Sequence, residues 1–245
     1  MASPRFYCPA PITANQVMAL PANLAHHAVR VLRLASGTPI VLFDGLGGEY
    51  PARLVIDGKS GLAEVGARQD REAELGGELI LIQGLASGDK MDWIIEKAVE
   101  LGARRLVPVT ARRSVPSLKG DRLEKRRQHW ARVVRSASEQ CGRNRLMQID
   151  APCSLDDYLR GPGVPAPDLT LCCHPDADTS LAQALAPAAN RIALLVGPEG
   201  GWSDDELALA TAHHATPVRF GTRVLRTETA GMALLAAVAA LKGWQ

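Results

Sequence analysis

Aromatic residues and long apolar runs are both scarce in this sequence. Phe, Trp and Tyr together make up only 4% of the 245 residues, so the core has to be built from aliphatic side chains. No stretch of about 18 consecutive apolar residues occurs, and we therefore expect no membrane span. The first residues lack a basic segment followed by a long apolar one, which predicts that there is no signal peptide.

The five cysteines follow none of the spacings that are typical of disulfide frameworks or metal sites. Their number is odd, two of them are adjacent (Cys172 and Cys173), and none stands in a C-x-x-C pair. This pattern indicates that each cysteine is a small buried hydrophobe of a reduced protein. We therefore predict a cytoplasmic location and no metal site.

The glycine-rich fingerprints of phosphate-binding proteins are also missing. The sequence contains neither G-x-G-x-x-G nor G-x-x-x-x-G-K-[ST], which argues against a nucleotide-dependent dehydrogenase. The rest of the composition is ordinary for a globular protein, with 47% hydrophobic and 22% charged residues.

Charge is unevenly distributed along the chain, although the net charge is only +2. Between residues 104 and 145 stand thirteen Lys and Arg residues but only three Asp and Glu residues. Such a cationic stretch favours a polyanionic partner such as RNA. The alternative is a helix face that is merely exposed to solvent.

The first part of the chain has the short periodicity of β-strands. In residues 1–72, apolar runs alternate with turn signals such as Asp44-Gly45 and Asp57-Gly58, which predicts a small β-barrel-like domain. A polar segment over residues 70–77 is interpreted as a linker. Strands are predicted over residues 38–43, 49–56 and 61–68, and a helix is predicted over residues 23–34.

The region from residue 73 to 245 alternates apolar runs of strand length with helical patterns. This alternation predicts an α/β domain with a parallel sheet. Strands are predicted over residues 78–85, 105–110, 168–174, 191–196 and 216–220, helices over 88–101, 121–140, 180–186, 203–212 and 227–241, and an exposed loop over 161–167.

A glycine-rich turn follows the apolar strand predicted over residues 191–196. It reads Gly-Pro-Glu-Gly-Gly at residues 197–201, and Ser203 stands where it can cap the next helix. Ligands of open α/β sheets bind at the carboxyl ends of strands, where glycines allow a close approach of the backbone. Because three acids follow Ser203, a phosphate at this helix N-terminus is disfavoured, and a neutral or cationic ligand is predicted. The alternative is a tight turn without a ligand.

A second polar loop follows the next predicted strand and covers residues 220–231. Arg223, Arg226 and Glu228 stand there with Thr227 and Thr229, between two apolar elements. Such a cluster is more often a binding site than a plain connection, and two loops at the ends of successive strands can form one pocket. The alternative is that Thr227 caps the last helix and Glu228 complements its dipole.

These two segments resemble the ribosomal RNA uridine-N3 methyltransferase family of the SPOUT superfamily. The resemblance includes Glu-Lys-Ala-Val-Glu-Leu-Gly at residues 96–102, Ser-Ala-Ser-Glu-Gln-Cys-Gly-Arg at 136–143 and, more loosely, residues 26–34 and 43–50. It implies a PUA-like RNA-binding domain followed by a SPOUT α/β domain with a C-terminal trefoil knot. It further implies S-adenosylmethionine as the cofactor, 16S ribosomal RNA of the small ribosomal subunit as the substrate, and a homodimer with the site near its interface.

The resemblance also implies roles for individual residues. Arg226 is the first candidate for stabilising negative charge on the uracil, and Glu228 or Glu199 for accepting its proton. The cofactor-binding residues are expected to be Leu195, Val196, Gly197, Glu199, Gly200, Gly201, Phe220, Gly221, Val224, Leu225, Arg226, Thr227, Thr229, Ala230 and Met232. The RNA-binding residues are expected to be Arg30, Arg33, Arg112, Arg113, Arg135, Arg143 and Arg145.

Two other functions are compatible with the same residues. A SPOUT methyltransferase that acts on transfer RNA or on a ribose hydroxyl would have a similar pocket. A non-catalytic RNA-binding or ribosome-assembly protein would keep the basic helix but would need no S-adenosylmethionine pocket. Binding of S-adenosylhomocysteine and the identity of the modified nucleoside distinguish these functions.

Overall fold

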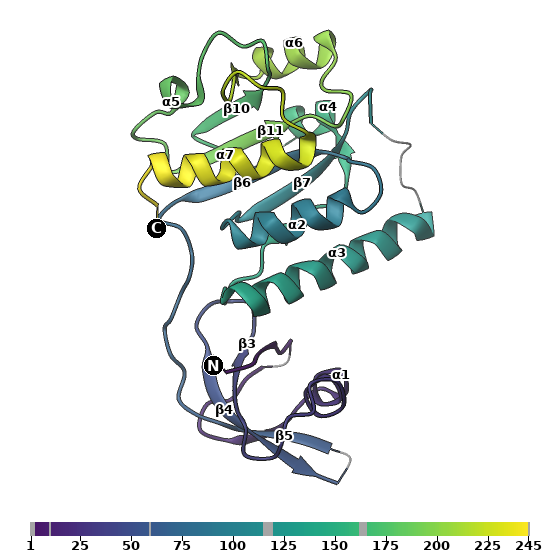
Figure 1. The fold of residues 1–245 in the computed structure, drawn as a ribbon, viewed down its shortest axis with the longest axis vertical. Coiled ribbons are helices and arrows are strands. Elements are labelled where there is room, and N and C mark those ends of the chain that lie inside the picture. Colours follow the sequence, from purple (N-terminus) through teal and green to yellow (C-terminus); the bar gives the residue numbers. More distant parts are fainter. Residues whose placement is uncertain (1–2, 10, 59, 115–119, 162–165, 245) are drawn as a thin grey trace. The chain divides into compact units, whose positions relative to one another are not determined.

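The computed structural model describes residues 3–9, 11–58, 60–114, 120–161 and 166–244 (Figure 1). Contacts within the chain divide it into two compact units. The N-terminal unit comprises Met1–Glu74 and Arg135–Leu146, and the C-terminal unit comprises Leu75–Val134 and Met147–Gln245. Helix α3 (Gly120–Cys141) therefore contributes residues to both units. Lys119, one of the thirteen basic residues, and positions 162–165 of the predicted loop lie outside the described residues.

The N-terminal unit contains a five-stranded sheet in the order β1-β3-β4-β5-β2. β1 runs parallel to β3, and the other neighbours are antiparallel. The three predicted strands are confirmed as β3, β4 and β5, whereas β1 and β2 are too short for an alternating pattern to show. The strands are β1 (Arg5–Tyr7), β2 (Val17–Ala19), β3 (Pro39–Phe43), β4 (Tyr50–Asp57) and β5 (Ser60–Val65).

The helix predicted over residues 23–34 is confirmed in part. It begins as α1 (Ala22–His26) and continues into a π-helical turn, η1 (His27–Val31). Its inward face packs on the aliphatic core of the sheet through Leu24, Ala25 and Ala28. Arg33 has a φ of 53°, a left-handed backbone conformation that ends the helical path.

Buried polar contacts hold the segment Arg135–Leu146 against the strands of the N-terminal unit. The buried carboxylate of Glu49 accepts hydrogen bonds from Arg5 at 2.6 Å and from Asn144 at 3.3 Å. The backbone N–H of Tyr7 donates to Glu139 at 2.8 Å. Because burying a charge is costly unless it is paired, this network fixes the place of the segment within its unit.

Arg143 corrects the sequence prediction, which assigns it to RNA phosphates. Its side chain is only 2% exposed, and its guanidinium donates to both carboxylate oxygens of Glu74, at 2.9 and 2.6 Å. A guanidinium that is buried in a bidentate ion pair is not accessible to a phosphate. Arg143 is therefore a structural residue of the N-terminal unit.

The C-terminal unit contains a parallel sheet in the order β12-β10-β11-β6-β7-β8, with β9 also paired to β7. The five predicted strands are confirmed, and β8 and β9 are too short to be predicted. The strands are β6 (Glu78–Gly84), β7 (Arg105–Thr110), β8 (Gln148–Ile149), β9 (Cys153–Ser154), β10 (Leu169–Cys173), β11 (Arg191–Val196) and β12 (Ala215–Val218).

Helices cover both faces of this sheet. On one face α7 packs on β6 and β11 beside α2 (Figure 1). Ile80 and Ile82 point to the opposite face, where α4 and α6 complete a second apolar core. Within the described residues, no helix is both long enough and apolar enough to cross a membrane. The helices are α2 (Lys90–Glu100), α3, α4 (Leu155–Arg160), α5 (Leu181–Ala184), α6 (Asp204–Ala212) and α7 (Thr227–Leu241).

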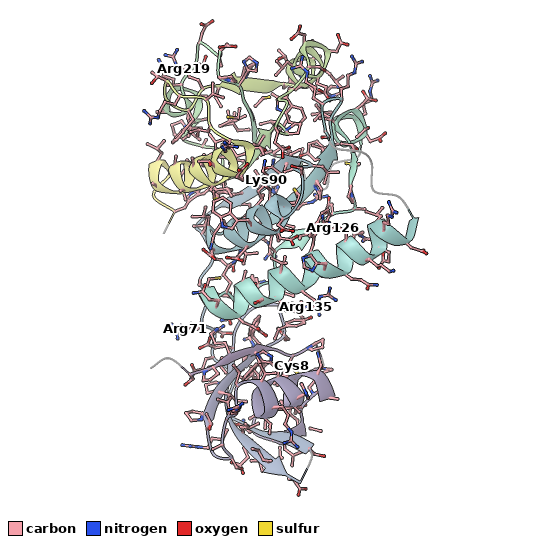
Figure 2. All side chains as sticks on the ribbon, turned by 45° about the vertical axis from the view of Figure 1, so that its right-hand side comes forward. Cys8, Arg71, Lys90, Arg126, Arg135 and Arg219 are labelled. Atoms are coloured by element: carbon pink, nitrogen blue, oxygen red, sulfur yellow. The ribbon has the colours of Figure 1, made fainter. Side chains whose placement is uncertain are left out.

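Helix α3 has an apolar stripe that is buried, and most of its basic residues are exposed. Trp130, Val134 and Ala137 are buried. Arg126 and Arg135 project from the same helix (Figure 2), and Arg126 lies 3.8 Å from Asp92 of α2. The exposed basic residues of α3 are Arg122, Lys125, Arg127, Arg132 and Arg135.

Candidate functional site

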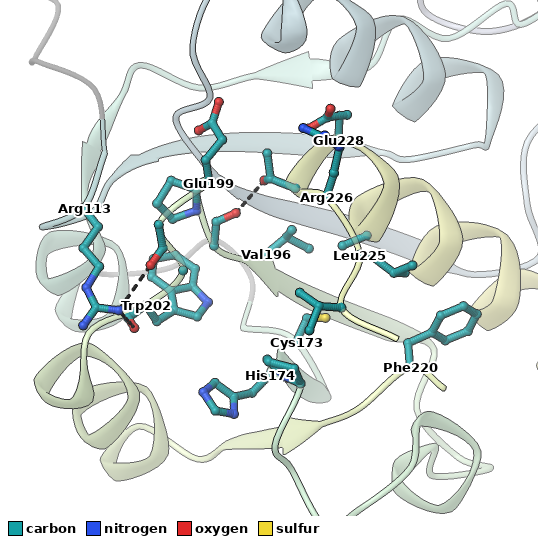
Figure 3. A pocket seen from close by; sticks show the side chains of 18 of the residues that line it. Arg113, Cys173, His174, Val196, Glu199, Trp202, Phe220, Leu225, Arg226 and Glu228 are labelled. Atoms are coloured by element: carbon teal, nitrogen blue, oxygen red, sulfur yellow. Dashed lines mark hydrogen bonds between the residues drawn. The ribbon is translucent and has the colours of Figure 1, made fainter. Parts of the chain in front are cut away.

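A cavity of about 630 Å³ opens at the carboxyl ends of β10, β11 and β12 in the C-terminal unit (Figure 3). Parallel strands bring the loops that follow them to one edge of the sheet, which is why segments far apart in the sequence meet here. The lining residues are Lys90, Arg113, Cys173, His174, Pro175, Val196, Gly197, Pro198, Glu199, Gly200, Gly201, Trp202, Phe220, Gly221, Arg223, Val224, Leu225, Arg226, Thr227, Glu228 and Ala230.

Thr227 joins the two loops that the sequence singles out. Its hydroxyl donates to the carbonyl of Gly197 at 2.5 Å and accepts from the side-chain amide of Gln83 at 2.8 Å. The alternative role of Thr227 as the cap of α7 is wrong, because Arg226 occupies the N-cap position and no side chain caps there. The two loops are therefore parts of one site, as the sequence predicts.

The glycine-rich turn is packed tightly against the end of β6. A Cβ atom on Gly84 would lie 2.4 Å from the backbone nitrogen of Pro198 and 2.8 Å from the carbonyl carbon of Gly197. Only a residue without a side chain allows this approach of two backbone segments. Gly84 is thus part of the site's framework, although it stands more than a hundred residues before the turn.

Glu199 lies in a cluster of donors at one end of the cavity. Its Oε1 accepts from the backbone N–H and the hydroxyl of Ser87, at 3.0 and 2.6 Å, and from Lys90 Nζ at 2.9 Å. Burial raises the pKa of this carboxyl, but the hydrogen bonds from Ser87 and Lys90 outweigh burial and lower the pKa to about 2. Glu199 is therefore ionised at any physiological pH.

Glu228 lies on the other side of Lys90, in the first turn of α7. Its Oε2 is 3.9 Å from Lys90 Nζ. Its side chain is 15% exposed, and among the described residues Oε2 is buried without a hydrogen-bond partner. Arg226, two residues earlier at the N-cap of α7, is exposed at the cavity rim (Figure 3). The guanidinium of Arg226 and the carboxylate of Glu228 thus lie at the same end of the cavity as Lys90.

The opposite wall is formed by Arg113 and Trp202. Arg113 donates to the backbone carbonyls of Gly200 and Trp202, at 3.2 and 3.3 Å, and so braces the turn from outside (Figure 3). Trp202 is 5% exposed, and among the described residues its indole nitrogen has no hydrogen-bond partner. Cys173 adds a neutral surface, because burial raises the pKa of its thiol.

The N-terminus of α6 is not open to an anion. Ser203 accepts from the backbone N–H of Glu206, and the Glu206 carboxylate accepts from the backbone N–H of Ser203 at 2.8 Å. This capping box and the three acids of the first turn offset the positive end of the helix dipole. The prediction that this site disfavours phosphate rests on the same residues.

Most of the residues predicted to bind a cofactor line the cavity. Leu195, Thr229 and Met232 do not. Leu195 is 0% exposed and packs in the core under α4 and α6, because alternate residues of a strand face opposite sides of the sheet. Thr229 is exposed and Met232 is half-buried farther along α7.

Three lining residues, Lys90, His174 and Trp202, were not predicted from the sequence, and neither was Gly84, which packs against the glycine-rich turn. The signal for Lys90 and His174 was available, since Lys90 follows the strand predicted over residues 78–85 and His174 ends the strand predicted over residues 168–174. No local signal marks Gly84, because its role depends on a backbone that comes from elsewhere in the chain. Among the described residues, no group of three metal-binding side chains comes together.

The residues predicted to bind RNA belong to both units. Arg30 and Arg33 are exposed in the N-terminal unit. Arg135 lies over the Tyr7 ring at 5.2 Å, and Arg145 pairs with Glu72 at 3.3 Å. In the C-terminal unit Arg112 pairs with Asp205, and Arg113 belongs to the cavity.

Two family models match the sequence and together cover most of it. Residues 73–239 match an RNA methyltransferase domain, and residues 20–66 match an RNA methyltransferase PUA domain. Among curated relatives, the ribosomal RNA small subunit methyltransferases E of Synechocystis sp. and Mycobacterium bovis are each 34% identical. Each alignment covers 88% of this chain, with 70% of the Synechocystis protein and 83% of the Mycobacterium protein.

Solved structures with the same fold extend over nearly the whole chain. The ribosomal RNA small subunit methyltransferase E from Neisseria gonorrhoeae, bound to S-adenosyl methionine, is 33% identical with a TM-score of 0.90. A putative methyltransferase from Legionella pneumophila, in complex with the same cofactor, is 28% identical with a TM-score of 0.91. Both comparisons cover 98% of each chain. The chain therefore belongs to the RNA methyltransferase family that includes the ribosomal RNA small subunit methyltransferases E, with a PUA domain preceding an RNA methyltransferase domain.

Proposed function

We propose that this methyltransferase transfers the methyl group of S-adenosylmethionine to N3 of a uridine in 16S ribosomal RNA. The observation that carries the proposal is the single cavity that unites residues 197–201 with the loop before α7 through the Thr227–Gly197 hydrogen bond. The named relatives and the cofactor seen in two of the similar structures support it.

The residues of the cavity fit this cofactor. S-adenosylmethionine is a nucleoside without phosphates that carries a positive sulfonium, and it supplies an electrophilic methyl group when bound. The cavity offers the carboxylates of Glu199 and Glu228, the apolar side chains of Val196 and Leu225, and the backbone of the glycine-rich turn. The N-terminus of α6 is occupied by its capping box and three acidic residues, so it is unfavourable for binding a phosphate. We assign the adenosine to the backbone of residues 197–201 and 225–230.

Two tasks remain for the protein's own residues at the uracil. The N3 proton has to be accepted, and the negative charge that spreads over the base has to be stabilised. We assign the second task to Arg226, whose side chain lies at the cavity rim. Glu228 and Glu199 are the candidates for the first. Because N3 lies on the pairing edge of uracil, the target base has to be unpaired or flipped out.

We also propose the wider setting of the enzyme. An RNA-binding domain comprises residues 1–72, and a methyltransferase domain comprises residues 73–245, of which Arg135–Leu146 belongs to the N-terminal unit. The methyltransferase domain contains a trefoil knot. A homodimer in the cytoplasm that acts on the small ribosomal subunit completes the proposal. Exposed apolar side chains of the C-terminal unit, Trp93, Val224 and Leu241, support a second subunit, which analytical ultracentrifugation tests.

Mass spectrometry of nucleosides tests the reaction and its substrate. We expect 16S ribosomal RNA from cells that lack the protein to lose one N3-methyluridine, and the purified protein to restore it with S-adenosylmethionine. Loss of a methyl group from transfer RNA or from a ribose hydroxyl instead would identify another SPOUT activity. No binding of S-adenosylhomocysteine in calorimetry would contradict the methyltransferase proposal altogether.

Replacing Arg226 by alanine should lower the single-turnover methylation rate by about 100-fold, since removal of one preorganised charge-stabilising group typically costs that much. Arg226→Lys should recover part of the rate. Arg223→Ala is the matched control, because Arg223 also lines the cavity but stands outside the turn that carries Glu228. An equal loss of methylation rate in Arg226→Ala and Arg223→Ala would contradict a specific role of Arg226.

The N-terminal unit should contribute phosphate contacts through Arg30 and Arg33. For the double variant Arg30→Gln/Arg33→Gln, we expect the slope of log Kobs for RNA against log salt to become shallower by about 1.5, since each phosphate contact contributes about 0.7 to 0.9. Arg160→Gln, which removes an exposed arginine paired with Asp156, is the control. An unchanged slope in the double variant would exclude this footprint.

A further inference from the structure

Two carboxylates and one lysine form a compact group at one end of the cavity. Lys90 Nζ lies 2.9 Å from Glu199 Oε1 and 3.9 Å from Glu228 Oε2. The three residues come from the start of α2, from the glycine-rich turn and from the first turn of α7. Both carboxylates are candidates for accepting the N3 proton, so the arrangement around each one decides between them.

Glu199 is engaged on the oxygen that faces its neighbours. Three donors converge on Oε1, two from Ser87 and one from Lys90. An oxygen that already accepts three hydrogen bonds has no lone pair directed at a substrate. The same contacts lower the pKa of Glu199 to about 2, which makes it a weak base. Glu199 therefore ties the glycine-rich turn to the loop after β6.

Glu228 has the opposite arrangement. Among the described residues, no donor lies within hydrogen-bond distance of its Oε2, although this oxygen is buried. Lys90 is too far away for a hydrogen bond but close enough to stabilise negative charge on the carboxylate. The charged groups that flank Glu228 on the cavity wall are Lys90, Glu199 and Arg226. Glu228 thus keeps a free lone pair beside the proposed uracil-binding residue.

We propose that Glu228 accepts the N3 proton and that Lys90 is a positioning residue which separates the roles of the two carboxylates. This inference rests on the proposed function. The N3–H bond breaks, the proton joins the carboxylate of Glu228, and the electron pair stays on N3. N3 uses that pair to bond the methyl carbon, while the electrons of the sulfur–methyl bond return to sulfur. Lys90 holds Glu199 through its hydrogen bond and leaves Glu228 oriented by charge alone.

The test compares Glu228→Gln with Glu199→Gln, which is the same substitution on the other side of Lys90. With saturating S-adenosylmethionine, Glu228→Gln should lose about 100-fold or more in single-turnover rate, the size of a general-base contribution. Its affinity for S-adenosylhomocysteine should change by less than about threefold, because that ligand lacks the sulfonium charge. Glu199→Gln should bind S-adenosylhomocysteine about tenfold more weakly, since it loses charge-assisted hydrogen bonds, and its rate at saturation should fall by less than that of Glu228→Gln.

Lys90 variants test the positioning role. Lys90→Met should weaken S-adenosylhomocysteine binding as Glu199→Gln does and should also lower the rate at saturation by about tenfold, whereas Lys90→Arg should restore the affinity. A structural role alone would change stability in both variants without this split between affinity and rate. Thermal unfolding of each variant separates loss of folding from loss of function.

A substrate with a more acidic N3 proton provides a second measurement. RNA that carries 5-fluorouridine at the target should reduce the difference in single-turnover rate between Glu228→Gln and the wild type, since a weaker base suffices. The difference in single-turnover rate between Glu199→Gln and the wild type should not change. If Glu199→Gln is the variant that loses rate and responds to fluorouridine, the assignment is overturned. If the wild type binds no S-adenosylhomocysteine, the proposed function fails first, and calorimetry detects that separately.

Discussion

Replacing Gly84 by alanine should weaken the binding of S-adenosylhomocysteine by about 100-fold. The added Cβ would lie 2.4 Å from the backbone nitrogen of Pro198 and 2.6 Å from its Cδ, so the glycine-rich turn has to move. Overpacking of this kind typically costs about 1–3 kcal/mol, and each 1.4 kcal/mol corresponds to a tenfold change in affinity. The displaced turn contains Gly197, whose carbonyl accepts the hydrogen bond from Thr227. Both loops of the cavity are therefore displaced.

Calorimetry with S-adenosylhomocysteine measures this effect. Gly76→Ala is the matched control, because Gly76 precedes β6 at its other end and a Cβ there would make an ordinary contact with Trp244 at 3.4 Å. We expect the control to bind within about twofold of the wild type, since the change lies outside the cavity. Unchanged affinity in Gly84→Ala would mean that the turn is free to shift without affecting the ligand.

Replacing Arg143 by methionine should destabilise the N-terminal unit by about 3–5 kcal/mol, the usual consequence of removing one partner of a buried ion pair. Methionine retains much of the volume but leaves the Glu74 carboxylate, which is 19% exposed, without its bidentate partner. Hydrogen exchange of the amides in β3, β4 and β5 measures the stability of this unit.

Arg145→Met is the control for this prediction. Arg145 stands two residues away, but its side chain is 38% exposed and its 3.3 Å ion pair with Glu72 is accessible to water. Exposed pairs of this kind contribute at most about 1 kcal/mol. The double variant Arg143→Met/Glu74→Met should recover part of the lost stability, because no unpaired charge remains. A loss of the same size in Arg145→Met would show that the basic segment as a whole, rather than the buried pair, is responsible.

Hydrophobic periodicity was sufficient for the longer elements of the C-terminal unit. The predicted strands over residues 105–110 and 191–196 and the predicted helix over residues 227–241 match β7, β11 and α7 to the residue. These segments are long enough for an apolar pattern to repeat, and glycines or polar residues mark their ends. The elements that escaped prediction, such as β1 and β9, are two or three residues long.

Residue type alone did not distinguish functional arginines from structural ones. Arg143 and Arg145 stand in one cationic stretch, yet the first is buried against Glu74 and the second is partly exposed. Their difference depends on the position of acidic residues about seventy positions earlier in the chain. A local pattern contains no information about a partner at that separation, so the RNA-binding prediction for Arg143 was wrong.

The sequence by itself determined the α/β class, the two loops of the cavity and the preference for a ligand without phosphates, because each depends on neighbouring residues. Only the tertiary structure decided that Thr227 bonds Gly197 rather than capping α7, that Gly84 lies under the glycine-rich turn, and that Lys90 stands between Glu199 and Glu228. The parallel sheet is the physical reason, since it brings the loops at its strand ends together, as in the contact between Gln83 and Thr227, which are 144 residues apart in the chain.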